Sequence, residues 1–126
     1  MRRTAITLAL FYLTLSVAAG YFLCTGTLHP ARRPLTPADQ FEAQSLALRE
    51  HASLDDVSIT TADHLQLRGW LLIPALSNHQ AVILLHGLGD NRIGMLGYAE
   101  LLLARHFTVL LPDARAHGAS DGTLAT

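Results

Sequence analysis

The stretch AVILLHGLGDN, residues 81–91, decides the fold, because a wholly apolar run ends there in a loop with two glycines. An apolar run without alternation predicts a strand over residues 81–86 that is covered on both faces, as in the middle of a parallel sheet. A second run of this kind, FTVLLP at residues 107–112, predicts another such strand. The two runs indicate an α/β fold.

A helix is expected between these two strands. Asp90 or Asn91 can cap its first turn. Its apolar face would consist of Met95, Ala99 and Leu102 or Leu103. Strand, helix and strand within about 30 residues form a βαβ unit, and such crossovers are nearly always right-handed. Ligands of open α/β sheets bind at the carboxyl ends of the strands, which is where the loops after residues 86 and 112 lie.

Two further elements are expected before residue 81. Thr36, Pro37 and Asp39 predict the start of a helix, as N-cap, first helical residue and acid near the positive helix end. The apolar stripe of this helix is thin and would consist of Phe41, Ser45 and Leu48.

The segment DVSITTADHLQLRGWLLIP, residues 56–74, predicts a β-hairpin of two half-buried strands. Val57, Ile59 and Thr61 alternate with polar residues, and residues 62–64 form a polar turn. The pattern then resumes with Leu65, Leu67, Leu71 and Ile73.

The N-terminus carries the long hydrophobic segment TAITLALFYLTLSVAAGYFLCTG, residues 4–26. Its 19 residues from Ala5 to Leu23 are uncharged. A bilayer core of about 30 Å needs roughly 20 apolar helical residues, whereas the apolar part of a signal peptide needs about 7–15. The length therefore favours a membrane anchor. A cleaved signal peptide is the alternative, because Ala18 and Ala19 offer small residues to a peptidase; lipidation of Cys24 is disfavoured by the bulky residues before it.

The predicted organisation has three parts. Residues 1–26 are a membrane anchor or signal segment, residues 27–35 a proline-containing linker, and residues 36–126 an α/β domain. Arg2 and Arg3 precede the apolar segment, while Arg32 and Arg33 follow it at a distance. This bias favours a single-pass protein with its C-terminal part outside the cytoplasm, or a secreted or periplasmic protein if the leader is cleaved.

Composition excludes several classes of function. The chain of 126 residues has nine basic residues, all arginine, and a formal net charge of −1, so it lacks the basic patch that nucleic-acid binding requires. Cys24 is the single cysteine, which excludes an intrachain disulfide and a cysteine-based metal site. His86, His117 and Asp113 could be combined into a metal site, but their spacing matches no metal motif, and loop histidines more often bind backbone groups. We expect no metal and no cofactor.

The sequence at residues 118–122, GASDG, matches the G-x-S-x-G pattern of a nucleophilic serine. That pattern has chemical meaning only where a strand turns sharply into a helix and raises the hydroxyl above the sheet. Ser120 lies nine residues beyond Leu111, after a proline and a glycine. We therefore interpret Ser120 as a residue other than the nucleophile. The alternative, His117 acting as its general base, lacks an acid partner in the sequence.

The combination of LLHGLGDN, residues 84–91, with LLPDARAHGASDG, residues 110–122, resembles the α/β-hydrolase superfamily. It is most similar to the serine-hydrolase branch that has a D-x-R-G-H-G-x-S-x-G loop after its fourth strand, including members with an N-terminal membrane segment. The resemblance covers about residues 56–122 and implies that the Leu88 N–H is an oxyanion-hole donor. It also implies that the active-site loops are supported by His86, Gly87, Gly89, Asp113, Arg115, His117, Gly118 and Ser120.

One residue departs from the family pattern. Ala116 stands where the family usually has glycine between arginine and histidine. If this position requires a positive φ, the loop must accept a strained alanine or shift.

The resemblance implies a nucleophile on an elbow after the next strand, followed by an acid and a histidine, and none of these is in this chain. We expect the N-terminal portion of a membrane-anchored serine hydrolase that cleaves an ester, amide or related acyl bond, with no activity from the 126 residues alone. Its partners would be an acyl substrate and a membrane, bound through residues 5–23. The strand over residues 81–86 would then have a bare edge. A membrane-tethered, non-catalytic interaction module and the remnant of a degraded gene are the alternatives.

Overall fold

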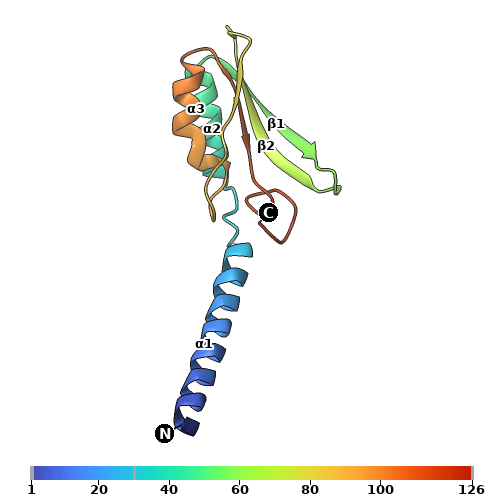
Figure 1. Cartoon of the computed structure of the whole chain (residues 1–126). Coiled ribbons are helices and arrows are strands. Elements are labelled where there is room, and N and C mark those ends of the chain that lie inside the picture. The colour runs from blue at the N-terminus through green and yellow to red at the C-terminus, as the bar shows by residue number, and fades with distance from the viewer. Residues whose placement is uncertain (1, 30, 126) are drawn as a thin grey trace.

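A computed structural model describes residues 2–29 and 31–125 as one long helix followed by an α/β domain (Figure 1). The elements in chain order are α1 (Arg2–Leu28), α2 (Pro37–Arg49), β1 (Ala52–Thr60), β2 (Gln66–Pro74), β3 (Ala81–Ile83), the 3₁₀ turn η1 (Arg92–Met95), α3 (Leu96–Leu103) and β4 (Thr108–Pro112).

The four strands form one mixed sheet in the order β1-β2-β4-β3. Strands β1 and β2 are the predicted antiparallel hairpin, and β2 is antiparallel to β4. Strands β3 and β4 are parallel, with Val82 opposite Val109, and α3 connects them. The predicted hairpin and βαβ unit are therefore confirmed, and they place the ends of β3 and β4 at the same edge of the sheet.

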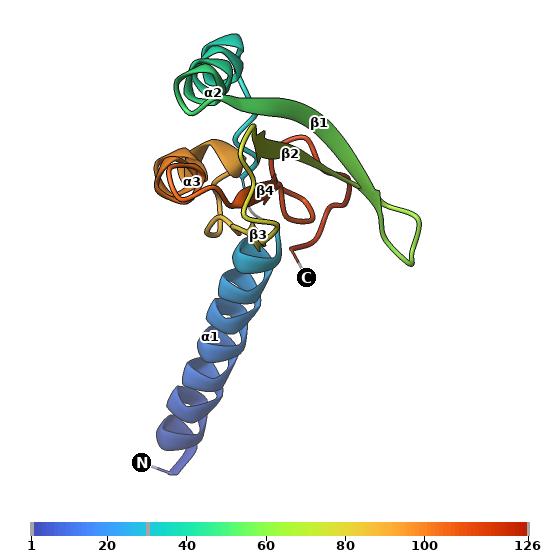
Figure 2. The same ribbon diagram turned by 90° about the horizontal axis from the view of Figure 1, so that it is seen from above.

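Both helices of the domain lie on one face of the sheet, as the two views in Figures 1 and 2 show. Trp70 and Leu72 of β2 and Leu111 of β4 are fully buried beneath them. Each such side chain contributes about 1.5–3 kcal/mol through its burial. The helices complete this core with Ala43, Leu46, Ala47, Leu96, Ala99 and Leu103.

Helix α2 begins with the predicted cap. The Thr36 hydroxyl accepts a hydrogen bond from the Asp39 N–H, and the Asp39 carboxylate accepts one from the Thr36 N–H, so both form a capping box. The backbone hydrogen bond from Thr36 is the main cause of the lowered pKa of Asp39. Helix propensity and capping thus set the position of α2, as the sequence indicated.

The predicted buried face of α2 was wrong. Phe41 and Leu48 are largely exposed, while Ala43, Leu46 and Ala47 are buried. These three residues have the i, i+3, i+4 spacing of one helical stripe. Small side chains on this stripe let α2 lie close to β1 and α3, and the larger apolar residues consequently point away from the core.

The prediction that residues 81–86 are covered on both faces was also wrong. Strand β3 is three residues long, and Ile83 and Leu85 are 61% and 69% exposed. The strand lies at the end of the sheet and pairs, among the described residues, with β4 alone. The bare edge that we expected is therefore present, and the face of the sheet away from the helices also carries the partly exposed Leu71 and Leu110.

The hairpin has the predicted strands and turn but the opposite burial in β2. Trp70 and Leu72 are buried, whereas Leu71 is half-buried and Ile73 is exposed. The two helices cover the face on which Trp70 and Leu72 lie. Alternation in the sequence predicted a strand, but the position of the helices decided which side of it is covered.

Helix α1 ends at Leu28, two residues beyond the predicted anchor segment 1–26, and projects from the domain (Figure 1). It is long and apolar enough to cross a membrane, with a mean hydropathy of 1.9 over its best window, and a signal sequence would meet the same criterion. The hydroxyls of Thr7, Thr25 and Thr27 donate to backbone carbonyls four residues earlier. Their polar groups are therefore satisfied within the helix, which suits an apolar environment.

The described residues of the predicted linker 27–35 are fastened to the domain. Arg32 donates to the Ser120 carbonyl at 3.0 Å and also to the Gly122 carbonyl. Arg33 forms an ion pair with Asp90, with Nη1 and Oδ1 2.7 Å apart. The end of α1 is thereby held against the loops that follow β3 and β4.

Candidate functional site

Two loops meet at the carboxyl ends of the parallel strands. We call residues 84–91, which follow β3, the glycine loop, and residues 113–122, which follow β4, the aspartate loop. They are brought together because β3 and β4 are adjacent and run in the same direction. All the residues that the sequence analysis assigned to the site lie on these two loops.

Two histidines connect the loops reciprocally. The Nε2 atom of His86, on the glycine loop, accepts a hydrogen bond from the Ala114 N–H at 2.9 Å. The Nε2 atom of His117, on the aspartate loop, accepts one from the Gly89 N–H at 3.1 Å. The two imidazole rings are 5.1 Å apart between centroids. Each histidine therefore fixes a backbone amide of the opposite loop.

The remaining ring nitrogens define the tautomer. The Nδ1 atom of His86 lies 2.8 Å from the Gly87 carbonyl, and that of His117 lies 2.8 Å from the Arg115 carbonyl. Because a carbonyl only accepts, each Nδ1 is assigned the proton, and each Nε2 is left as an acceptor. All four ring nitrogens are occupied by backbone groups, and no cluster of three metal-ligating side chains occurs among the described residues.

Among the described residues the Leu88 N–H is a free donor, as is the Gly87 N–H before it, and it directly precedes a fixed amide. It donates to no protein acceptor in the part of the chain that the structure describes, whereas the next N–H, that of Gly89, is held by His117. Gly89 has a φ of +75°, which an L-residue adopts only with strain. This left-handed residue turns the chain directly after Leu88, at the carboxyl end of β3.

Asp113 is fully buried at the start of the aspartate loop. Its two carboxylate oxygens accept hydrogen bonds from the N–H groups of Arg92 and Ala119, each at 2.8 Å. The Arg92 Nε lies 3.5 Å from the same carboxylate. Asp113 thus ties the aspartate loop to itself and to the start of the helical segment η1.

Arg92 was not predicted from the sequence. Its side chain is buried, with the guanidinium 4.8 Å from the centre of the Trp70 ring. Burial lowers the pKa of Arg92, and the neighbouring Asp113 carboxylate opposes this effect. The charge of Arg92 therefore has two compensating contacts, one with a carboxylate and one with an aromatic face. Nothing in the sequence around residue 92 distinguished this arginine from an exposed one.

Ser120 is fully buried, and its hydroxyl is used by the backbone. The Oγ atom donates to the Asp113 carbonyl at 2.7 Å and accepts from the Arg68 N–H at 2.9 Å. The neighbouring Asp121 accepts from the Gln66 N–H at 2.9 Å. Ser120 lies in a turn without a following helix among the described residues, and its side chain makes no hydrogen bond with His117 there. It fastens the aspartate loop to β2.

Arg115 fastens the aspartate loop to the turn of the hairpin. Its guanidinium contacts both carboxylate oxygens of Asp63, at 2.5 and 3.0 Å. The hydrogen bonds from Arg115 hold the pKa of Asp63 well below its usual value of 3.8. This pair is exposed, so it orients the loop more than it stabilises the fold.

Alanine in place of the family's usual glycine at position 116 puts an L-residue in the left-handed region of backbone conformation. Ala116 has a φ of 61°, the left-handed conformation in which the family's usual glycine is unstrained. Gly118 is also left-handed, with a φ of 47°, and a Cβ there would lie 2.1 Å from an oxygen of Asp113. The aspartate loop therefore accepts a strained alanine at one position but has no space for a side chain at the other.

No protein-family model and no curated protein matches the chain. Among solved structures, an esterase of Pyrococcus furiosus, Pf2001, matches in three crystal forms at 33%, 34% and 32% identity, with TM-scores of 0.62, 0.60 and 0.60. The matches cover 79%, 75% and 78% of this chain but 36%, 34% and 35% of the esterase chain. The chain has the fold of the N-terminal portion of an α/β-hydrolase.

This hydrolase portion spans about a third of the length of the esterase that it matches. It contains the hairpin, the first βαβ unit and the two loops at the carboxyl edge of the sheet. Those loops are where open α/β sheets bind their ligands. The residues described above therefore form the candidate functional site of this fold.

Proposed function

We propose that this chain is the N-terminal part of a membrane-anchored serine hydrolase that cleaves an ester, amide or related acyl bond. The observation that carries the proposal is the free Leu88 N–H at the carboxyl end of β3. A fixed backbone donor at this place can bind the oxygen that becomes negative when a carbonyl is attacked, which is the largest single contribution in many acyl-transfer reactions.

The histidines support this role of Leu88 by restricting the glycine loop. His117 holds the Gly89 N–H, and His86 holds the Ala114 N–H of the neighbouring loop. The donor therefore needs no reorganisation when the oxyanion forms, which is the physical basis of oxyanion-hole catalysis. A second donor would come from the residue after the nucleophile.

In the proposed reaction a serine gives its proton to the histidine as it attacks the acyl carbon, and the histidine passes this proton to the leaving alcohol or amine as the acyl-enzyme forms. Water then hydrolyses the acyl-enzyme to the acid and the free serine. We place this serine, with its acid and histidine, in sequence that follows residue 126. The bare edge of β3, the exposed Ile83 and the half-buried Leu71 and Leu110 support this placement, because they offer a pairing edge and an apolar face for further elements. The 126 residues alone are then inactive.

The anchor is α1, with the domain outside the cytoplasm. Its uncharged segment of 19 residues and its exposed apolar side chains support a membrane location. No metal or cofactor takes part in this mechanism.

A membrane-tethered interaction module is the second candidate, and the exposed edge of β3 is what favours it. Such an edge can pair with a strand of another protein without any chemistry. Hydrolysis of p-nitrophenyl butyrate distinguishes the two functions. The rate is measured for membranes that contain the protein expressed from its complete coding sequence and for membranes that contain residues 1–126 alone. We expect hydrolysis by the complete protein alone. Hydrolysis by residues 1–126, or no hydrolysis by either, would contradict the proposed function.

A further inference from the structure

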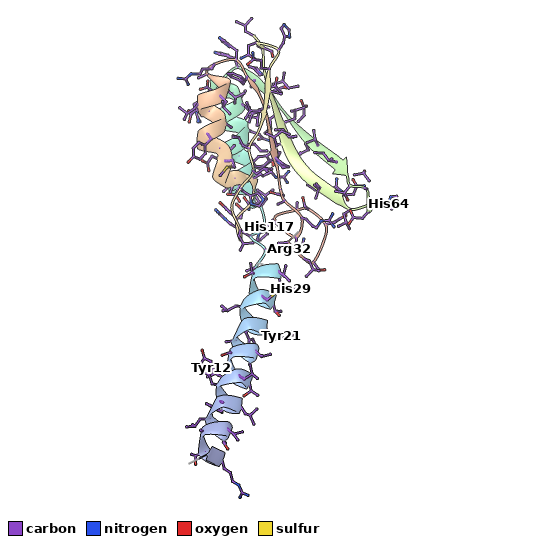
Figure 3. The ribbon with its side chains drawn as sticks, viewed as in Figure 1. Tyr12, Tyr21, His29, Arg32, His64 and His117 are labelled. Atoms are coloured by element: carbon purple, nitrogen blue, oxygen red, sulfur yellow. The ribbon has the colours of Figure 1, made fainter. Side chains whose placement is uncertain are left out.

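The apolar helix joins the domain at the same edge that carries the candidate site. The Leu28 carbonyl, at the end of α1, accepts a hydrogen bond from the Ala125 N–H at 2.9 Å. Arg32 donates to the carbonyls of Ser120 and Gly122 on the aspartate loop. Figure 3 shows Arg32 and His117 close to the end of the helix that carries His29. The site therefore lies on the α1 side of the domain.

The length of α1 sets the height of this edge above a bilayer. The 19 uncharged residues from Ala5 to Leu23 rise about 28 Å as a helix, close to the hydrocarbon thickness of about 30 Å. The last five residues of α1, 24–28, rise about 7 Å, close to the thickness of one headgroup layer. Tyr21 and Phe22 then lie at the interface, where aromatic rings are enriched. The helix consequently ends at the headgroup surface, and the loops lie directly on it.

The edge that faces this surface carries exposed apolar side chains beside its charged ones. Leu85 and Leu88 of the glycine loop are 69% and 62% exposed, and Leu124 is also exposed. A cavity of about 430 Å³ lies at the aspartate loop and is lined by Leu65, Arg115, Gly122, Thr123 and Leu124. Another cavity, of about 520 Å³, lies near His106 at the opposite edge of the sheet. The volume of the cavity at the aspartate loop is within the range of small-molecule sites. With Leu65 and Leu124 in its lining and no carboxylate among the described residues there, a cavity of this size fits an acyl chain better than a small cationic substrate.

We propose that the site takes an amphiphilic acyl ester directly from the membrane leaflet on which it lies. This inference rests on the proposed hydrolase function and specifies its substrate class as lipid. A lipid in the same leaflet reaches the edge by lateral diffusion, at a high effective concentration. A soluble substrate must instead enter between the domain and the headgroups. Arg32 acts as a positioning residue, because its hydrogen bonds keep the loop edge turned toward the membrane.

The test uses the complete protein in phosphatidylcholine vesicles with dioleoylglycerol as the lipid probe and p-nitrophenyl butyrate as the soluble one. We expect dioleoylglycerol in the enzyme's own vesicles to be hydrolysed about tenfold faster than the same lipid supplied in separate vesicles. Seven helix-forming residues inserted after Gly26 add two turns, which raises the edge by about 10 Å with little rotation. This variant should lose the tenfold advantage and keep its rate on butyrate.

Two control variants show whether an insertion or the loss of an arginine by itself damages the enzyme: an insertion after Arg3 and Arg105→Gln. The same seven residues inserted after Arg3, on the other side of the membrane, should leave both rates unchanged. Arg32→Gln should lower the ratio of the lipid rate to the butyrate rate about fivefold, as expected for the loss of a charged hydrogen bond, whereas Arg105→Gln at the opposite edge of the sheet should not.

The outcomes separate the two levels of the proposal. Hydrolysis of butyrate with equal lipid rates in the same and in separate vesicles, or an unchanged advantage after the insertion at Gly26, would overturn the inference and leave the hydrolase function standing. A mature protein without residues 1–26 by mass would also overturn it. Absence of hydrolysis of both probes would contradict the hydrolase function itself.

Discussion

The side chain of His117 accepts a hydrogen bond from the backbone N–H of Gly89 at 3.1 Å, across the gap between the two loops. His86 makes the reverse connection to Ala114. The glycine loop and the aspartate loop are therefore one unit. Among the described residues the N–H groups of both Gly87 and Leu88 are free, and we assign the chemical role to that of Leu88. The predictions below test this unit, the groups that hold it and the chemistry that we assign to it.

Removing the Leu88 N–H should damage catalysis, whereas truncating the Leu88 side chain should not. Leu88→Pro deletes the donor, and loss of one oxyanion-hole donor lowers kcat about 100-fold to 1,000-fold. Leu88→Ala keeps the N–H and should retain kcat within about threefold, because the oxyanion contact uses the backbone. Steady-state hydrolysis of p-nitrophenyl butyrate by the complete protein measures both, with circular dichroism as the check on folding. Equal losses in the two variants would argue against a backbone donor at this position.

Three glycine-to-alanine variants should differ in stability in a fixed order. At Gly118 a Cβ would lie 2.1 Å from an oxygen of Asp113, and the residue is left-handed, so Gly118→Ala should cost more than about 2 kcal/mol. At Gly89 the space is open but φ is +75°, so Gly89→Ala should cost about 1 kcal/mol. Gly87→Ala has open space and no such φ, and should cost less than about 0.5 kcal/mol. Urea denaturation of the complete protein in detergent gives these values; a variant at Gly118 as stable as that at Gly87 would show that the aspartate loop has another conformation.

Asp113 should be the most sensitive acid in the domain. Its buried carboxylate accepts two backbone hydrogen bonds and faces the buried guanidinium of Arg92. Asp113→Asn leaves that charge without its partner and should lower the free energy of unfolding by about 3 kcal/mol. Asp55→Asn, at an exposed position of β1, should change it by less than about 0.5 kcal/mol. Denaturation curves in which both variants lose the same stability would refute the structural role of Asp113.

The Asp63–Arg115 pair predicts a pH effect of known sign. The hydrogen bonds from Arg115 lower the pKa of Asp63 in the folded protein below its usual value of 3.8. An acid whose pKa is lower in the folded protein than in the unfolded chain stabilises the fold at any pH above its pKa in the unfolded chain. This contribution is lost as the pH falls below 3.8 toward the pKa of Asp63 in the folded protein. Carboxyl carbon NMR of Asp63 should show a midpoint below 3.8 that rises toward it in Arg115→Gln but not in Arg105→Gln. An unchanged midpoint in Arg115→Gln would show that the ion pair does not form in solution.

Local signals in the sequence predicted the elements well. Each of these signals depends only on residues that are neighbours in the sequence. They are the capping box at Thr36 and Asp39, the apolar runs at residues 81–86 and 107–112, and the glycines after β3. These signals were sufficient to place a hairpin and a βαβ unit, and hence to bring the two loops to one edge. For position 116 the resemblance gave only a condition, a strained or shifted loop if the position needs a positive φ, and the structure meets that condition with a left-handed Ala116.

Features that depend on distant residues were not predictable in this way. The buried stripe of α2 follows from where β1 and α3 lie, and so it uses Ala43 and Ala47 and leaves Phe41 exposed. The exposure of β3 follows from the absence of a second neighbour among the described strands. Arg32 and Ser120 are 88 positions apart in the chain, and no pattern near either residue indicates their contact.

The most direct test of the central claim is to identify which serine reacts with a fluorophosphonate probe. The complete protein in membranes is labelled, digested with protease and examined by mass spectrometry, so that the modified residue is located without any mutation. The account predicts a modified serine in sequence after residue 126 and an unmodified Ser120, whose hydroxyl is buried and bonded to the backbone on both sides. A probe attached to Ser120 would contradict it.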